Sequence, residues 1–297
     1  MLRGLYTAAQ GMKVNQQRHD IANNNLANIN TPGFKGEEAV VRSFPEELLF
    51  FMGKKQHSHV PAHSRVASHL GGQPPRVGYL HQGVTVEEIV SRFAQGAIRE
   101  TGNEFNVAII DGLDDQKGFF AVKKDLDSDD VFYTRAGDFR LREVDGVQYL
   151  ATQDGEFVMQ RELIAGVGFT GQLMPVEIIE EDFVIHSNGS IEVFETGFPP
   201  IQGELHLVQF ANEQLPGLTK EGHGLFRINE DFLGAGFEPE IAQNIQTRQK
   251  FIEGSNVDPT QAIMDMIIAQ RAYEANQRVI QSYDRSLEKA VNEVGRV

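Results

Sequence analysis

The densest group of potential metal ligands lies in a polar stretch of the first third of the chain. Five of the nine histidines fall between His57 and His81, and His57, His59 and His63 are the most closely spaced. Two imidazoles two residues apart project to one side of an extended strand and could share a metal ion, with His63 or a carboxylate as third ligand. A passage rich in histidine, serine, glycine and proline is more typical of a solvated linker. We therefore predict a linker here, with no metal or other cofactor.

Two groups of aspartates carry the oxygen ligands that calcium prefers. The groups are Asp111, Asp114 and Asp115, and Asp125, Asp127, Asp129 and Asp130. The second group lacks the glycine at the sixth position and the glutamate at the twelfth that complete a calcium-binding loop, and its twelfth position is Ala136. A solvated hairpin loop explains this composition better than a calcium site.

The residue composition and the absence of known catalytic motifs argue against an enzyme. The chain has no cysteine, which excludes disulfides, thiolate metal sites and a cysteine nucleophile. It also lacks a nucleophile elbow, a phosphate-binding loop, a zinc-protease helix and a dinucleotide fingerprint. With 27 Lys+Arg and 42 Asp+Glu the net charge is −15, which disfavours nucleic-acid binding. We predict a protein that is not an enzyme and takes no small-molecule substrate.

Asparagines crowd the N-terminal region, where six of them occupy sixteen residues. They are Asn15, Asn23, Asn24, Asn25, Asn28 and Asn30. Amide side chains both donate and accept hydrogen bonds, so a row of them can join neighbouring helices or chains. Asparagine also suits a frayed helix end and the turn that follows it. Both interpretations stay open from composition alone.

Helical patterns at the two ends would position these groups. Apolar residues spaced by three and four predict an amphipathic helix over residues 2–27, and the turn Asn30-Thr31-Pro32-Gly33 ends it. Near the C-terminus, Asp258, Pro259 and Gln261 supply a carboxylate cap, a first-turn proline and a reciprocal amide. A second helix is therefore predicted from residue 259 to 294, about 54 Å long.

A strict seven-residue repeat runs along this C-terminal helix. It consists of Met266, Tyr273, Ile280, Leu287 and Val294. Such a repeat predicts a seam that faces a partner helix. We expect the other line of the seam to be half polar and to consist of Ile263, Gln270, Gln277, Asp284 and Val291. A helix this long and thinly apolar needs a partner beyond one small domain.

Between the ends, the apolar pattern changes to period two and predicts strands. The expected strands cover residues 105–110, 119–122, 131–134, 147–150, 176–179, 183–186, 191–194, 205–210 and 225–228. The dipeptides Asp145-Gly146, Asp154-Gly155 and Asn188-Gly189 predict tight turns between them. Residues 44–52 suggest a short helix, within an extended linker over residues 43–82. The fold class is α+β, with terminal helices that form a coiled-coil domain and a central antiparallel, mainly β domain.

Three blocks of the sequence resemble the axial proteins of the bacterial flagellum. DIANNNLANINTPGFK at residues 20–35, preceded by LYTAAQGM at 5–12, is similar to the N-terminal signature of rod, hook and hook-associated subunits. GSNVD at 254–258 and MIIAQRAYEAN at 266–276 resemble the C-terminal signature of the rod and hook subset. TGN at 101–103, VAI at 107–109, GFFAV at 118–122 and YTRAGDF at 133–139 resemble its central β domain. The loop at residues 112–118 is longer than the turn usual in that family, and the histidine-rich passage has no counterpart.

The resemblance implies a structural subunit of the basal-body rod. Such a subunit is exported uncleaved through the flagellar type III apparatus, and its terminal helices pair in a hollow helical tube. Its partners would be copies of itself, other rod and hook subunits, and the export apparatus. Consistent with this expectation, the N-terminus lacks the apolar core of a cleavable signal peptide. An alternative is a hook or junction protein that binds peptidoglycan or another axial component.

The resemblance also implies a division of the chain and a set of contacts. Residues 1–35 and 255–297 would form the helical assembly domain, 36–85 and 235–254 a connecting region, and 86–234 the β domain. The expected assembly contacts are Leu5, Met12, Asn24, Asn25, Leu26, Asn28, Asn30, Phe34, Asn256, Ile263, Met266, Gln270, Tyr273, Asn276, Ile280 and Leu287.

Overall fold

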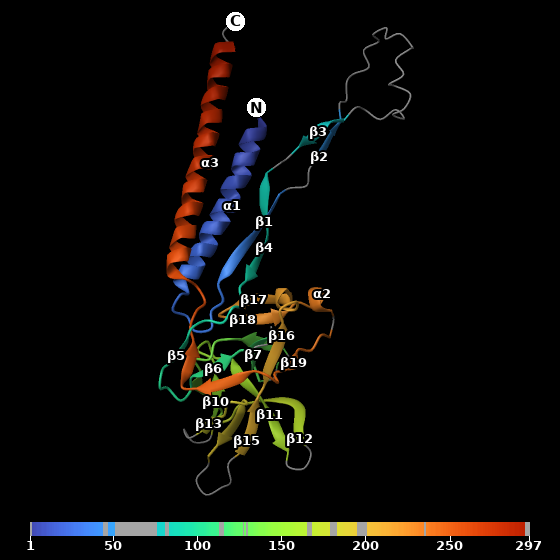
Figure 1. Ribbon diagram of the computed structural model, residues 1–297, viewed down its shortest axis with the longest axis vertical. Helices are drawn as coiled ribbons and strands as arrows, with labels where there is room; N and C mark the ends of the chain where they lie inside the picture. The colour runs from blue at the N-terminus through green and yellow to red at the C-terminus, as the bar shows by residue number, and fades with distance from the viewer. Residues whose placement is uncertain are drawn as a thin grey trace, which may run out of the picture. The chain divides into compact units, whose positions relative to one another are not determined.

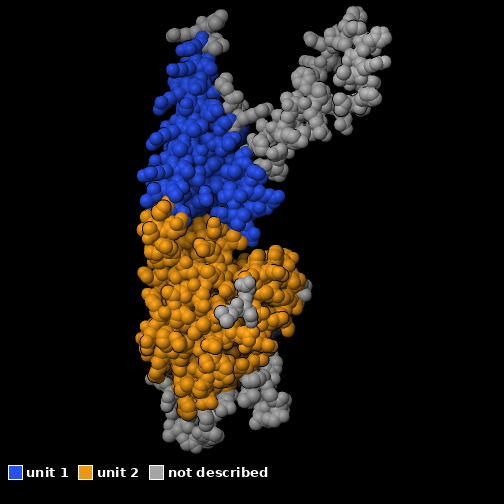
Figure 2. Space-filling model, viewed as in Figure 1, with its two compact units in different colours: residues 1–20, 39–89, 265–297 blue, residues 21–38, 90–264 orange. Residues whose placement is uncertain are grey.

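The computed structural model describes residues 2–43, 47–50, 76–80, 83–112, 116–126, 128, 130–164, 168–178, 183–194, 201–234 and 236–294. The chain divides into two compact units (Figure 2): unit 1 holds residues 1–20, 39–89 and 265–297, and unit 2 holds residues 21–38 and 90–264. The expected connecting region is therefore shared between the units. The five histidines from His57 to His81 lie outside the described residues, as do Asp114, Asp115, Asp127 and Asp129.

The two terminal helices are confirmed. Helix α1 spans Leu2–Ala27 and helix α3 spans Pro259–Val294 (Figure 1). The carboxylate cap predicted for α3 is confirmed, because Asp258 Oδ1 accepts hydrogen bonds from the backbone N–H groups of Thr260 at 2.8 Å and Gln261 at 3.2 Å. Proline at the first helical position has no N–H to leave unpaired.

Two ribbons of paired strands follow α1. Strand β1 (Glu37–Ser43) pairs with β4 (Val84–Ser91), and β2 (Glu47–Phe50) pairs antiparallel with β3 (Arg76–Leu80). The short helix expected within residues 44–52 is wrong for its described part, since residues 47–50 form β2. Pairing with β3 satisfies the backbone groups of this segment and overrides its local helical pattern.

Unit 2 contains the predicted antiparallel β structure. Its main sheet has the order β13-β14-β15-β11-β7-β8-β18-β17, with β9, β10, β12, β16 and β19 paired beside this path. The strands are β7 (Gln116–Lys123), β8 (Phe132–Thr134), β9 (Arg140–Val144), β10 (Val147–Ala151), β11 (Phe157–Ile164), β12 (Gly168–Pro175), β13 (Phe183–Ile185), β14 (Ser190–Val193), β15 (Ile201–Leu205), β16 (Leu207–Ala211), β17 (Leu218–Gly222), β18 (Leu225–Ile228) and β19 (Glu240–Ile241).

Smaller pairs complete unit 2. Strand β5 (Ile98–Glu100) pairs with β21 (Phe251–Glu253), and β6 (Val107–Ile110) pairs with β20 (Gln246–Gln249). A 3₁₀ turn, η1 (Leu215–Gly217), and a single helical turn, α2 (Glu230–Leu233), connect neighbouring strands. In both pairs, a strand that precedes α3 joins a strand from the first half of the chain.

The predicted tight turns are also present. Asp145 and Gly146 have φ angles of 53° and 83° between β9 and β10, as a type I′ hairpin requires. Gly155 and Gly189 have φ angles of 103° and 85° at the other two predicted turns. Residues 176–178 form no strand, although Val176 and Ile178 are fully buried against β10 and β11.

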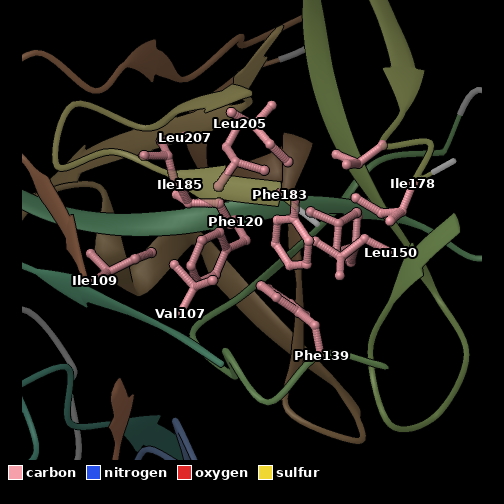
Figure 3. Packing of buried hydrophobic residues seen from close by; sticks show 14 of the residues in the cluster. Val107, Ile109, Phe120, Phe139, Leu150, Ile178, Phe183, Ile185, Leu205 and Leu207 are labelled. Atoms are coloured by element: carbon pink, nitrogen blue, oxygen red, sulfur yellow. The ribbon is translucent and has the colours of Figure 1, made fainter. Parts of the chain in front are cut away.

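Strand β7 lies at the centre of the packing because both of its faces are covered. Phe120 and Val122 point into one apolar cluster, which Figure 3 shows, together with Val107, Leu150 and Leu205. Phe119 and Ala121 point into a second cluster on the opposite face, where Phe119 packs edge-on against Phe210 with ring centroids 5.4 Å apart. Burial on both faces explains the uninterrupted apolar run GFFAV at residues 118–122.

The single strand expected over residues 205–210 is interrupted at His206. Strand β15 ends at Leu205 and β16 begins at Leu207, and the His206 backbone pairs with Met159 and Ala121. Within the described part of the chain, the buried His206 Nδ1 atom has no hydrogen-bond partner. Burial, together with the positive charge of Arg161, lowers the pKa of His206 to about 4.

This histidine should make unit 2 sensitive to acid. In the unfolded chain His206 has the ordinary histidine pKa of 6.5, whereas in the folded chain its pKa is about 4. Between these pH values the unfolded chain binds a proton at His206 that the folded chain does not bind. Stability should therefore fall as pH drops through this window, by up to about 3 kcal/mol. Denaturant unfolding at pH 7, 5.5 and 4.5 should show a loss that His206→Gln reduces. His186→Gln, at an exposed histidine, is the control, and an equal pH profile for both variants would contradict the assignment.

Candidate functional site

The turn that follows α1 is fitted against the β core of unit 2. Gly33 adopts a φ of +67°, and its N–H donates to the Glu253 carbonyl at 2.8 Å. A Cβ atom on Gly33 would overlap the backbone of Arg135 and Ala136 at the end of β8. Glycine is thus required at this position for two reasons: the left-handed conformation, and the close approach of the turn to the backbone of Arg135 and Ala136.

Four charged side chains from four distant segments meet directly beyond this turn. Lys35 Nζ lies 2.7 Å from Glu253 Oε1, and Arg135 lies 2.8 Å from Glu253 Oε2. Arg135 also binds Asp111, with Nη1 and Oδ1 2.6 Å apart. The side chains of Lys35, Arg135 and Glu253 are each only 1% exposed, and that of Asp111 is 4% exposed. We call these four residues the charge cluster.

The hydrogen-bond capacity of the charge cluster is well used. Glu253 Oε1 also accepts from the Gly96 N–H at 2.7 Å, and Lys35 Nζ donates to the Ala94 carbonyl at 3.0 Å. Arg135 Nη1 donates to the Gly118 carbonyl at 2.7 Å. Two positive and two negative charges are therefore paired inside the protein, and the partly exposed Lys117 Nζ lies 3.5 Å from Asp111 Oδ2 at the edge of the charge cluster. Buried charges are tolerated when they are paired in this way.

Electrostatics in the charge cluster follow from this balance. Burial and the neighbouring Arg135 lower the pKa of Lys35 to about 8, which still leaves it protonated at neutral pH. Burial opposes ionisation of Asp111, but the Arg135 guanidinium outweighs it and holds the pKa of that carboxyl below its usual value. Burial alone would lower the pKa of Arg135, yet Glu253 and Asp111 together raise it. All three groups are thus held in their charged forms at neutral pH.

Two of the predicted asparagines clamp the backbone beside the charge cluster. Asn25 Oδ1 accepts from the Glu37 N–H and Asn25 Nδ2 donates to the Glu37 carbonyl, both at 2.8 Å. Asn256 Oδ1 accepts from the Gly36 N–H at 2.8 Å, while its Nδ2 donates to the Ala94 carbonyl at 3.0 Å. Both amides are therefore engaged within their own chain.

In unit 1, residues 2–20 of α1 pack antiparallel beside residues 265–294 of α3 (Figure 1). A Cβ atom on Gly4 would overlap the Tyr283 ring, with Cζ 2.6 Å away, and one on Gly11 would lie 2.9 Å from Asn276 Nδ2. Ala8, between the two glycines, is 5% exposed, and Ala269 of α3 is 3% exposed. Small side chains thus line the α1 face of this contact.

Comparisons with known proteins match both ends of the chain. A family model described as flagella basal body rod protein matches residues 5–35, and a model of the C-terminal region of flagellar basal body rod FlgEFG proteins matches residues 248–293. The flagellar basal-body rod protein FlgG of Borreliella burgdorferi is 31% identical, with 98% of each chain covered. The chain belongs to the flagellar basal-body rod protein family.

Other relatives agree with the rod-family assignment. FlgG of Bacillus subtilis is 29% identical over 98% of this chain and 99% of its own. The flagellar hook-basal body complex protein FlhO of Bacillus subtilis is 29% identical over the whole of both chains. Members of the rod family are structural components of the flagellar basal body, so this chain is a structural protein and not an enzyme.

The two matched segments of this rod-family chain contain half of the charge cluster and both clamping asparagines. Lys35 and Asn25 lie in the first segment, and Glu253 and Asn256 in the second. Asp111 and Arg135 come from the central β structure. Sequence reasoning missed the charge cluster, although Arg135 directly follows the apolar segment expected as a strand at residues 131–134.

The predicted contact residues of the rod-family N-terminal region differ in accessibility. Phe34 is 5% exposed and lies under Lys220, whose Nζ is 4.3 Å from the ring centroid and 2.6 Å from Glu37 Oε1. Asn28 Nδ2 donates to the carbonyl of the exposed Asn24 at 2.9 Å. Leu5, Met12 and Leu26 are half-buried, and Asn30 is exposed. Phe34 therefore already has an intrachain role, whereas Asn24 and Asn30 face outward.

The predicted contacts on α3 separate into two faces. Half-buried positions are Met266, Tyr273, Asn276, Ile280 and Leu287, whereas Ile263 and Gln270 are exposed. The second line of the face toward α1 holds Ala269, Asn276 and Tyr283. The expected line of Ile263, Gln270, Gln277, Asp284 and Val291 is exposed and does not face α1, so it stays a prediction for a contact with another copy. Asn276 and Tyr283 lie against the glycines of α1, and Ala269 is the small residue of this line.

The described residues were compared with the requirements of a metal site and of a membrane-spanning helix. Among them, no three histidine, aspartate or glutamate side chains converge as they would around a metal ion. No described helix is both long enough and apolar enough to cross a membrane.

Proposed function

We propose that this chain is an axial subunit of the flagellar rod that is exported through the flagellar type III apparatus and polymerises through its terminal helices into a hollow helical tube. Its place in the rod family and the names of its relatives support a rod position. The absence of cysteine suits a protein that must refold after export without an oxidation step.

The observation that carries the proposal is an apolar row on the outer side of α3 in unit 1. Ile268 is 56% exposed and Val279 is 42% exposed, and the exposed Ala275 lies between them. Spacings of seven and four residues place all three on one helix face. Adjacent to this row, Ile267 is 40% exposed. A helix of another copy, amphipathic in the same way, fits such a row.

Charge placed in this row should block assembly without unfolding the subunit. Ile268→Glu, expressed in a strain that lacks the gene, should abolish swimming in soft agar, and electron microscopy should find basal bodies without a complete rod. The purified variant should keep its stability to within about 0.5 kcal/mol because the side chain is already exposed. Gln277→Glu is the control: it adds a charge at another exposed position of α3, and cells that express it should swim. Normal swimming by Ile268→Glu would overturn the proposal.

A further inference from the structure

The contact between α1 and α3 in unit 1 is asymmetric. Helix α1 contributes Gly4 and Gly11, and α3 contributes the larger Tyr283 and Asn276 that lie against them. Glycine destabilises a helix interior relative to alanine. Two glycines on one face of α1 therefore need a packing reason, and the space that these two α3 side chains occupy supplies it.

The spacing of the two contacts is the same on both helices. Gly4 and Gly11 are seven residues apart, as are Tyr283 and Asn276. Continuing this antiparallel register places Arg18 opposite Ala269. Steps of three and four residues along the facing sides pair Ala8, between the two glycines, with Ile280, between Asn276 and Tyr283. We propose that Gly4 and Gly11 are register-determining residues, two holes that receive Tyr283 and Asn276 and so fix how far α1 lies along α3.

Two glycine contacts distinguish the observed register from registers shifted by one heptad, whereas a single contact would not. Sliding α1 by one heptad, about 10 Å, keeps the seven-residue pattern in phase. In one shifted register Tyr283 meets Gly11, but Asn276 then meets Arg18. In the other, Asn276 meets Gly4 and Tyr283 lies beyond the start of α1. Only the observed register seats both side chains on glycine.

The consequence for assembly rests on the proposed function, but the register itself does not. In the assembled rod, a fixed register would set which α1 side chains flank the exposed row of Ile268 and Val279. A chain with slipped helices would present a different surface to the next copy. The register can be measured in the purified full-length chain, where no assembly is needed.

The lack of native cysteine makes disulfide cross-linking a direct test of register. The matched pair is Ala8→Cys with Ile280→Cys, and the two shifted pairs combine Ala8→Cys with Tyr273→Cys or with Leu287→Cys. A disulfide needs Cβ atoms about 4 Å apart, so the matched pair should form an intrachain bond at least about tenfold faster than either shifted pair. Similar rates for all three pairs, measured by gel mobility after mild oxidation, would overturn the proposal.

Paired substitutions separate the holes from general helix stability. Gly4→Ala in the matched-pair background should slow cross-linking about tenfold, although alanine is the better helix former. Tyr283→Ala should restore the rate in that variant, whereas Asn276→Ala should not. Unchanged or faster cross-linking in Gly4→Ala would contradict the inference. If the cross-links behave as expected while Ile268→Glu still swims, the register stands and only the proposed function fails.

Discussion

Replacing Glu253 with glutamine should lower the free energy of unfolding of unit 2 by about 3–5 kcal/mol, because the change removes one member of a buried ionic network. Both carboxylate oxygens of Glu253 are occupied, one by Lys35 and one by Arg135, and the side chain is 1% exposed. Without the charge of Glu253, Asp111 is the one carboxylate of the charge cluster left to Lys35 and Arg135, and Lys117 already lies 3.5 Å from its Oδ2. Urea unfolding at pH 7 would measure the loss.

Two further variants make the test of the charge cluster specific. Glu104→Gln removes a carboxylate from an ion pair with Lys250 whose side chains are 52% and 48% exposed, and it should cost less than about 1 kcal/mol. Lys35→Met in the Glu253→Gln background restores the charge balance and should recover part of the lost stability. If the double variant is as unstable as the sum of the two single variants, the residues are not coupled as described.

Gly33→Ala should be the second severe substitution. The left-handed conformation alone costs an alanine about 1–3 kcal/mol, and overlap with the backbone of Arg135 adds to that cost because backbone yields less than a side chain does. The substitution should also displace Lys35, two residues later, from Glu253. We expect lower stability in urea and faster amide exchange in residues 31–37.

Gly146→Ala isolates the conformational part of this effect. Gly146 has a φ of +83° with open space around its Cα, so alanine there meets no neighbour. The difference between Gly33→Ala and Gly146→Ala should therefore measure the cost of the close approach to Arg135. Equal losses for the two variants would show that the turn is not tightly fitted against β8.

Local signals explain what the sequence predicted well. Asp258 and Pro259 specify the start of α3 through side-chain capping and a missing N–H, and both act within a few residues. Glycine turns such as Asp145-Gly146 likewise encode their hairpin locally. Alternating apolar residues then sufficed to predict antiparallel β structure, including β18 with its observed bounds.

Contacts between distant residues explain what the sequence did not predict. Nothing near Glu253 indicates that it will meet Lys35, a residue 218 positions away. The line of α3 that faces α1 lies one position before the expected line. The apolar Ile263 and Val291 mark the exposed line, whereas the contact uses the polar Asn276 and Tyr283. On α1 the contact uses Gly4, Ala8 and Gly11, which a count of large apolar residues overlooks.

Residues that are in contact in unit 2 lie far apart in the sequence, and this affects when unit 2 can fold. Lys35 meets Glu253 across 218 residues and Gly36 meets Asn256 across 220, and strands β20 and β21 pair with β6 and β5 from the first half of the chain. Closing such large loops is slow. A chain made from its N-terminus cannot form these contacts until residue 256 has been synthesised. Until then, Lys35 and Gly36 lack the partners that hold them in the folded chain.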